Sequence, residues 1–147
     1  MFHILVVDDD KNTRKLIEAV LRRENFTVST SENGKDALGK LDGEHIDLVV
    51  LDVMMPEMDG YEFTKTLRES ENDIPILMVS AKQLPTDKHK GFLVGTDDYI
   101  TKPFYTKELL SRISANLRRS KFNAGNIYKK GDIVVDFDRY KISRQGD

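Results

Sequence analysis

Short apolar runs alternate with longer amphipathic segments over the first 120 residues of this chain. Most of the runs are apolar at every position, which is typical of strands covered by helices on both faces. The run that begins at Phe26 instead alternates apolar and polar residues. We therefore expect five strands, at 4–7, 26–31, 48–51, 76–79 and 99–100.

Between these runs, apolar residues recur three and four positions apart, which predicts amphipathic helices. The first such segment places four residues on one face: Leu16, Ile17, Val20 and Leu21. We expect five helices, at 11–24, 34–41, 61–67, 86–94 and 105–119. Strict alternation of strands and helices predicts right-handed crossovers and a doubly wound α/β domain. The expected architecture is a flavodoxin-like five-stranded parallel sheet in the order 2-1-3-4-5.

The pattern changes after residue 120. Asn123-Ala124-Gly125-Asn126 interrupts the amphipathic repeat, so residues 121–126 are expected to form a linker. Beyond it, 133–137 and 139–142 are expected to form a short antiparallel β segment. Because two strands are only marginally stable alone, we interpret 127–147 as the start of a second, incomplete domain that follows the domain at 1–120.

Composition narrows the chemistry that these elements can carry. The 147 residues contain no cysteine, which excludes disulfides, iron–sulfur clusters and thiol nucleophiles. The three histidines, His3, His45 and His89, show no paired metal-ligand spacing. No apolar run reaches the roughly 18 residues of a membrane span, and the N-terminus is acidic from Asp8, unlike a signal peptide. We therefore expect a cytoplasmic protein without a membrane partner.

Aspartates stand where two of the expected strands end. Asp8, Asp9 and Asp10 follow the first strand, and Asp52 follows the third. In the order 2-1-3-4-5 these strands are neighbours at the topological switch point, where ligands bind. Carboxylates that converge there repel one another, and a divalent cation relieves the repulsion; oxygen ligands favour Mg²⁺, or Mn²⁺, over zinc. The alternative is that the aspartates only cap the following helices, which is the role expected of Asp10.

A hydroxyl and an ammonium are expected at the same edge of the sheet. Ser80 ends the fourth strand, and Lys102 follows the fifth. Lys102 can pair with Asp52 or with anionic oxygens bound to it, and a cis peptide bond to Pro103 would fix its direction. A solvated surface lysine is the competing interpretation. No glycine-rich turn follows the first strand, so a bare phosphate would be repelled without a metal.

Taken together, these residues resemble the receiver domain of two-component response regulators. The matching segments are 4–10, 52–60, 80–81 and 95–104, and the resemblance covers about residues 2–120. It implies a CheY-like fold. The segment Asp-Asp-Tyr-Ile-Thr-Lys-Pro-Phe at 97–104 and the strands expected after residue 126 look most like the OmpR/PhoB subfamily. By this resemblance, 127–147 would begin a winged-helix DNA-binding domain.

The resemblance implies a phosphoacceptor and a metal site at the edge of the sheet. Asp52 would accept a phosphoryl group from a sensor histidine kinase. Mg²⁺ would be held by Asp8, Asp9, Asp52 and the backbone carbonyl of Met54. The domain would then be a signalling module and not an enzyme, with only self-catalysed phosphotransfer and slow autodephosphorylation.

The resemblance also implies a switch. Lys102 would contact the phosphoryl oxygens, Ser80 would hydrogen-bond the new phosphoryl group, and Tyr99 would be the aromatic side chain that follows Ser80. Two positions depart from the common pattern: Thr96 stands where alanine is common, and Ser80 where threonine is commoner. Both departures leave the expected active-site chemistry intact.

Charged residues gather on the expected fourth and fifth helices and the strand between them. They are Lys88, Lys90, Asp97, Asp98, Glu108, Arg112, Arg118 and Arg119. An ordinary solvated surface is one interpretation. The resemblance implies a two-fold homodimer through these elements on phosphorylation, joined by pairs of Lys88 with Glu108 and of Asp98 with Arg112. Promoter DNA would be bound by the full-length protein only.

Two other functions remain open from the residues alone. A magnesium-dependent aspartyl-phosphate phosphatase of the haloacid dehalogenase type has an acid two residues after its nucleophile, where this chain has Met54. A phosphorylation-independent dimerising regulator would not need the intact set of Asp8, Asp9, Asp52, Ser80 and Lys102. Magnesium-dependent binding of a phosphoryl mimic would exclude the second of these.

Overall fold

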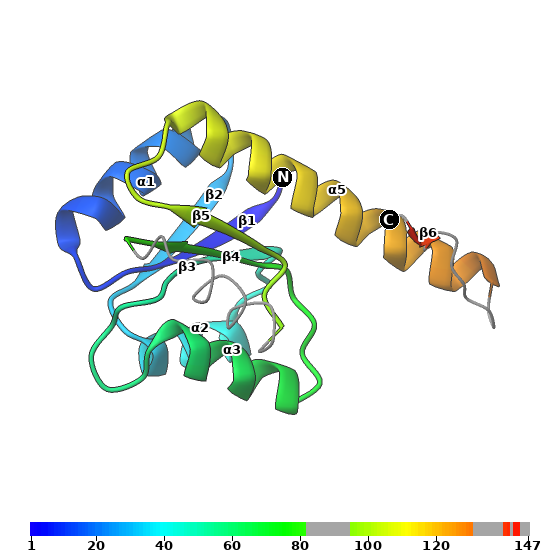
Figure 1. The fold of residues 1–147 in the computed structure, drawn as a ribbon, viewed down its shortest axis with the longest axis horizontal. Helices are drawn as coiled ribbons and strands as arrows, with labels where there is room; N and C mark the ends of the chain where they lie inside the picture. The colour runs from blue at the N-terminus through cyan, green and yellow to red at the C-terminus, as the bar shows by residue number, and fades with distance from the viewer. Residues whose placement is uncertain (82–94, 131–139, 142, 145–147) are drawn as a thin grey trace. The chain divides into compact units, whose positions relative to one another are not determined.

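A parallel sheet organises the N-terminal part of the computed structural model, which describes residues 1–81, 95–130, 140–141 and 143–144 (Figure 1). The five strands are β1 (His3–Val7), β2 (Thr27–Ser31), β3 (Leu48–Asp52), β4 (Ile76–Ser80) and β5 (Asp98–Thr101). They are ordered β2-β1-β3-β4-β5, and every neighbouring pair is parallel. The predicted strand order is confirmed.

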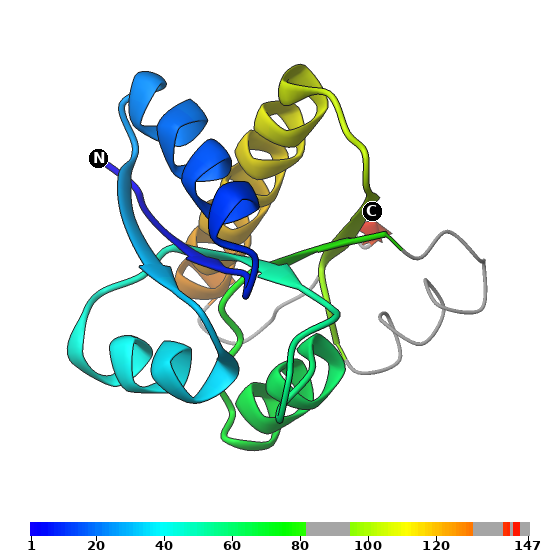
Figure 2. The ribbon, with the colours of Figure 1, turned by 90° about the vertical axis from the view of Figure 1, so that its left-hand side faces the viewer.

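Helices cover both faces of this sheet. They are α1 (Lys11–Arg23), α2 (Gly34–Gly43), α3 (Gly60–Glu69) and α5 (Thr106–Lys130). The first part of α5 and α1 lie on one face, and α2 and α3 lie on the other (Figure 2). The helix expected at 86–94 lies outside the described residues. None of the helices in the described part of the chain combines the length and the apolar character that crossing a bilayer requires.

The core follows from the apolar runs of the sequence. Residues 4–7, 48–51 and 76–79 are all buried, because both faces of β1, β3 and β4 are covered. The apolar face expected for α1 is narrower than the sequence indicated. Ile17 is buried, whereas Leu16 is 59% exposed, since it lies at the margin of the helix face that meets the sheet.

Polar side chains cap the starts of α1, α2 and α3. Asp10 caps α1 by accepting the Thr13 backbone N–H, which confirms its predicted role. Asn33 caps α2 in the same way. Asp59 and Glu62 form a reciprocal capping box at the start of α3. Because the side chain of Asp10 is used as the cap, Asp8 and Asp9 are the two aspartates between β1 and α1 that stay available for a site.

The expected linker at 121–126 is helical. The helix α5 continues without interruption from Thr106 to Lys130. Gly125 disfavours a helix interior by only about 1 kcal/mol relative to alanine, and no proline stands between residues 106 and 130. The sequence therefore has no residue that forces the helix to end where the linker was expected.

The C-terminal unit, residues 117–147, carries little described β structure. Its strands β6 (Tyr140–Lys141) and β7 (Ser143–Arg144) pair in parallel, but they are not the two segments that were expected to pair in antiparallel orientation. The other expected strand, at 133–137, lies outside the described residues, so β6 has no long partner among them. Two residues per strand do not define a domain, and the domain boundaries remain a prediction.

Candidate functional site

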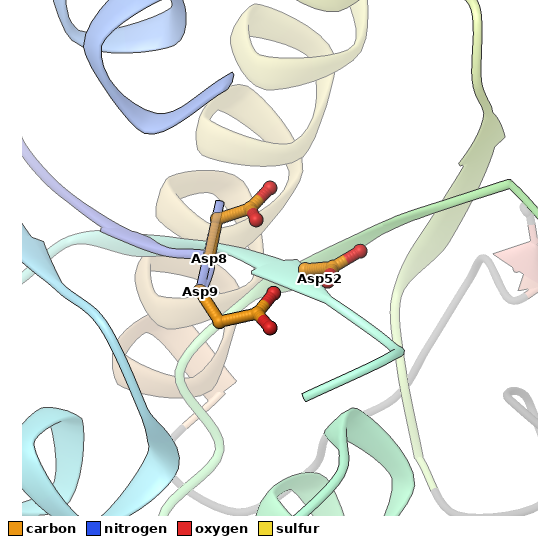
Figure 3. Close-up of side chains that lie close together, drawn as sticks. All are labelled: Asp8, Asp9 and Asp52. Carbon is orange, nitrogen blue, oxygen red and sulfur yellow. The ribbon is translucent and has the colours of Figure 1, made fainter. Parts of the chain in front are cut away.

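Three carboxylates converge at the C-terminal edge of β1 and β3 (Figure 3). Asp8 and Asp9 directly follow β1, and Asp52 is the last residue of β3. One oxygen from each lies within 4.8 Å of the others. Asp8 is 2% exposed and Asp52 is 6% exposed, whereas Asp9 is open to solvent. The cluster is therefore closed on its inner side and reachable from outside.

The register of the sheet brings these carboxylates together. Val7 of β1 is the pairing partner of Leu51 of β3, so the next residue in each strand direction is an aspartate. Parallel neighbours carry their C-terminal ends to the same edge, as the sequence predicted. Asp10 does not join the cluster, because its side chain is engaged by Thr13 at the start of α1.

Lys102 supplies the positive charge at this edge. Its Nζ lies 3.3 Å from Asp8 Oδ2 and 3.3 Å from Asp52 Oδ1. The predicted pairing with Asp52 is therefore present, and the Lys102–Pro103 peptide bond is cis. Burial acts to lower the pKa of Lys102, but the two carboxylates outweigh it and raise that pKa above its ordinary value. The ammonium stays charged.

Burial raises the pKa of Asp52 to about 6, and the charge of Asp8 adds to the effect while Lys102 opposes it. At neutral pH Asp52 is thus mainly ionised, but it is more basic than an ordinary aspartate. Three carboxylates face one ammonium, so the cluster carries an excess of negative charge. An all-oxygen donor set with that excess fits a hard divalent cation such as Mg²⁺.

Backbone contacts hold the hydroxyl and the lysine at the same edge. Ser80 is fully buried and pairs with Thr101 across the β4–β5 register. The Lys102 backbone N–H donates to the Ser80 carbonyl at 2.6 Å. The ends of β4 and β5 are therefore tied together where Ser80 and Lys102 were predicted to meet.

Tyr99 and Thr96 carry buried hydroxyl groups. The Tyr99 ring packs in the core cluster, and its hydroxyl oxygen has no hydrogen-bond partner within the described part of the chain. Thr96 Oγ1 is buried and likewise unpartnered there. A buried hydroxyl without a partner opposes folding, so among the described residues nothing offsets the burial of these two hydroxyl groups.

The loop after β3 is packed tightly against Asp52. The Gly60 backbone N–H donates to the Val53 carbonyl at 2.9 Å. A Cβ at Gly60 would lie 2.8 Å from the Asp52 carbonyl oxygen and 2.9 Å from Val53 Cα. Met54 lies within this loop with its side chain exposed. Gly60 therefore lies in close contact with the backbone of Asp52 and Val53.

Arg14 contributes to the site but was not identified from the sequence. Its Nη1 donates to the backbone carbonyl of Asp8 at 2.7 Å. Arg14 stands one turn into α1, so the cap at Asp10 determines the direction of its side chain. The only signal in the sequence was a basic residue on the first turn after the acidic segment, and that signal is common on solvated helices.

The charged residues expected at a dimer interface make contacts within the chain. Asp98 pairs with Arg112 at 2.7 Å and accepts from the Asn116 side chain. Arg112 also lies 3.8 Å from Glu108. Asp97 accepts the Ile76 backbone N–H and pairs with Arg68. Arg119 is exposed, and Lys88 lies outside the described residues. The expected intermolecular pairs stay predictions.

Known proteins resemble the chain over most of its length. A family model for the response regulator receiver domain matches residues 4–114. Heme response regulator HssR of Staphylococcus epidermidis is 40% identical over 143 residues, which cover 97% of this chain and 63% of HssR. Transcriptional regulatory protein ResD of Bacillus subtilis is 39% identical over 151 residues, covering 97% of this chain and 62% of ResD. The chain thus spans less than two thirds of these relatives.

Solved structures share the fold. The receiver domain of Francisella response regulator 1452 superposes with a TM-score of 0.79 at 32% identity, covering 82% of this chain and 99% of that one. DrrB of Thermotoga maritima, described as an OmpR/PhoB homolog, has a TM-score of 0.74 at 38% identity over 82% of this chain and 54% of DrrB. Both of these neighbours are response regulators.

Proposed function

Because this chain belongs to the response regulator receiver domain family, we propose that Asp52 is its phosphoacceptor and that Asp8, Asp9 and Asp52 bind Mg²⁺ for the transfer. The convergence of the three carboxylates with Lys102 carries this proposal. The family is a signalling family and not one of conventional enzymes, so the product is a modified state of the chain itself.

The proposed reaction is an in-line phosphoryl transfer. An Asp52 carboxylate oxygen attacks the phosphorus of a phosphohistidine on a sensor histidine kinase. The P–O bond to Asp52 forms, the P–N bond breaks, and the histidine nitrogen leaves with the bonding electron pair. Because the transition state is loose, catalysis consists of positioning and charge stabilisation. A bound divalent cation would supply part of the positive charge.

Different residues of the chain would serve different roles in this phosphoryl transfer. Burial and the charge of Asp8 keep Asp52 more basic than an ordinary aspartate, which favours a nucleophile. Lys102 is already within 3.3 Å of Asp52 Oδ1, so its ammonium stands where phosphoryl oxygens would develop charge. The backbone carbonyl of Met54 would complete the cation site, and the Ser80 hydroxyl would bond the new phosphoryl group.

The consequence of phosphorylation is proposed to be a switch of surface and assembly. Tyr99 would follow Ser80 in that switch. Dimerisation through the segment at 86–94, β5 and α5 would require Asp98 and Arg112 to exchange their present pairing within the chain for pairing between copies. In the full-length protein, a winged-helix domain beginning at 127–147 would then bind promoter DNA. A sensor kinase would act on this domain in the cytoplasm.

Intact-mass analysis after incubation with acetyl phosphate tests the phosphoacceptor. Wild type is expected to gain one phosphoryl group with Mg²⁺ and none with EDTA, and Asp52→Asn is expected to gain none. Asp10→Asn is the matched control, because it removes the same charge beside the site while asparagine still caps α1. It is expected to be modified like wild type.

Two results would contradict the proposal. An adduct on Asp52→Asn would assign the phosphoryl group to another residue, and the absence of any adduct on folded wild type would leave a regulator that acts through contacts alone. The phosphatase alternative is not favoured, because the exposed Met54 side chain offers no acid or base two residues after Asp52.

A further inference from the structure

The strand β2 is an outermost strand of the sheet, because it pairs with β1 on one side and with no described strand on the other. This unpaired side of the strand is the β2 edge, and it is distinct from the C-terminal ends of the strands where the carboxylates lie. The sequence of β2, Thr-Val-Ser-Thr-Ser, carries no charge and no proline, so nothing within the strand opposes pairing with another strand. The Thr27 backbone N–H donates to Phe2, and the Ser31 carbonyl accepts from Asp8. Backbone groups alternate along a strand, so those of Val28 and Thr30 face outward.

Both outward carbonyls are occupied by cationic side chains. Arg22 Nη2 donates to the Val28 carbonyl at 2.9 Å. Lys40 Nζ donates to the Thr30 carbonyl. Arg22 belongs to α1 and Lys40 to α2, and these two helices lie on opposite faces of the sheet (Figure 2).

Each of these cations is held by an acid one turn earlier on its own helix. Glu18 lies 3.0 Å from Arg22, and Asp36 lies 3.5 Å from Lys40. An acid four residues before a base is the favourable orientation for such a pair. The same arrangement therefore occurs twice, once on each helix that flanks β2.

The outward groups of β2 are self-complementary. In an antiparallel pair of two β2 strands with a two-fold axis at Ser29, Val28 of each copy would exchange both backbone hydrogen bonds with Thr30 of the other. That pairing requires the two carbonyls that Arg22 and Lys40 now occupy. We propose that the β2 edge is a strand-pairing surface for a second copy of this chain, and that Arg22 and Lys40 keep it closed.

The test compares Arg22→Ala/Lys40→Ala with Arg23→Ala/Lys35→Ala. The control removes two exposed cations from the same helices and changes the net charge equally. Without phosphoryl donor or Mg²⁺, sedimentation velocity is expected to show self-association of the first variant about a hundredfold tighter than that of the control, since each charge-assisted hydrogen bond that need not be displaced is worth about tenfold.

Two further variants locate the contact. Ser29→Cys introduces the only cysteine of the chain, at the non-hydrogen-bonded pair on the proposed axis, where the Cα separation suits a disulfide. It is expected to cross-link under oxidation when Arg22 and Lys40 are both absent, and much more slowly when they are present. Thr30→Pro removes an outward N–H without touching the β1 ladder, and should return the opened variant to a monomer.

One result of these measurements would support the proposal, and two would overturn it. Association that Thr30→Pro reverses, with cross-linking through Ser29→Cys, supports the proposal. Association that survives Thr30→Pro would place the contact elsewhere on the molecule and overturn it. A folded Arg22→Ala/Lys40→Ala variant that stays as monomeric as the control, with unchanged amide exchange at Val28 and Thr30, would overturn it too. Phosphorylation plays no part in any of these measurements.

Discussion

At the scale of single residues, Asp52 is the position where environment and chemistry are most closely linked. It lies between Asp8, which repels its charge, and Lys102, which attracts it. Burial decides the balance and raises the pKa of Asp52 to about 6, against an ordinary value of 3.8. The proposed reaction needs Asp52 in its ionised form. Keeping Asp52 ionised costs the folded protein free energy.

That cost predicts a pH dependence of stability. Because the folded-state pKa of Asp52 exceeds the unfolded value, its contribution to the free energy of unfolding is fully present below pH 3.8 and is lost as pH rises through about 6. In EDTA at pH 8, the free energy of unfolding of Asp52→Asn should therefore exceed that of wild type by about 3 kcal/mol. The difference should shrink towards pH 4.5, as measured by urea titration.

Asp10→Asn is a control, because the pKa of Asp10 is shifted in the opposite direction from the pKa of Asp52. Hydrogen bonds from Thr13 lower the pKa of Asp10, so its contribution is present above the unfolded pKa and is lost as pH falls. Asp10→Asn should thus never stabilise the protein at pH 8. If Asp52→Asn gives the same difference from wild type at both pH values, its effect comes from packing and not from titration.

Thr96 carries a buried hydroxyl group to which the described part of the chain offers no hydrogen bond. Its buried hydroxyl is unpartnered within the described residues, whereas the fully buried Thr64 donates its hydroxyl to the Gly60 carbonyl at 2.9 Å. Thr96→Ala should leave the free energy of unfolding unchanged or raise it by up to about 1 kcal/mol. Thr64→Ala should lower it by about 1–2 kcal/mol. Equal losses in both variants would contradict this difference.

At the scale of elements, the junction between β3 and α3 decides how the loop after Asp52 is held. The capping box of Asp59 and Glu62 determines where α3 begins. The helix then starts with Gly60, whose backbone packs on that of Asp52 and Val53. A side chain at this position has no room, so the requirement for glycine is one of close approach and not of an unusual backbone angle.

Gly60→Ala should therefore lower the free energy of unfolding by about 2 kcal/mol, because the new methyl group meets backbone atoms that cannot move aside. It should also slow modification by acetyl phosphate, since Asp52 would be displaced. Gly39→Ala is the matched control. Its Cβ would meet nothing within 4 Å in the interior of α2, and it should stabilise the protein by about 0.5–1 kcal/mol. Chemical denaturation of both variants measures the contrast.

At the scale of the whole molecule, the order of the strands makes the site possible. Asp8, Asp52 and Lys102 come from three elements far apart in the chain, and they meet because β1, β3 and β5 are parallel and end at one edge. The unit that contains them spans Met1–Asn116. The helix α5 runs on from this unit into residues 117–130.

This division predicts the outcome of a truncation. A chain that ends after Ser120 keeps the five strands, the acidic cluster and Lys102. It is expected to unfold at the same denaturant midpoint as the whole chain and to gain one phosphoryl group from acetyl phosphate with Mg²⁺. A lower midpoint would mean that residues 121–147 stabilise the receiver unit, which would contradict a domain boundary at 121–126.

Much of this molecule follows from local patterns. Runs that are apolar at every position predicted buried parallel strands, and the direction of those strands predicted that Asp8, Asp9, Asp52, Ser80 and Lys102 would share one edge. The role of Asp10 as a helix cap was also predicted from the sequence. These features depend on periodicity, chain direction and nearest neighbours, all of which are present in the order of the residues.

Other features depend on contacts between residues that are far apart in the sequence and are brought together by folding. The exposure of Leu16, the contact of Arg14 with the Asp8 carbonyl and the pairing of Asp98 with Arg112 within the chain have no local signal. The cations that cover the β2 edge have no local signal either. Each depends on distance, burial or dielectric environment between groups brought together by folding. Helical spacing predicts which residues share a face, but tertiary packing decides how much of that face is buried and which charges meet.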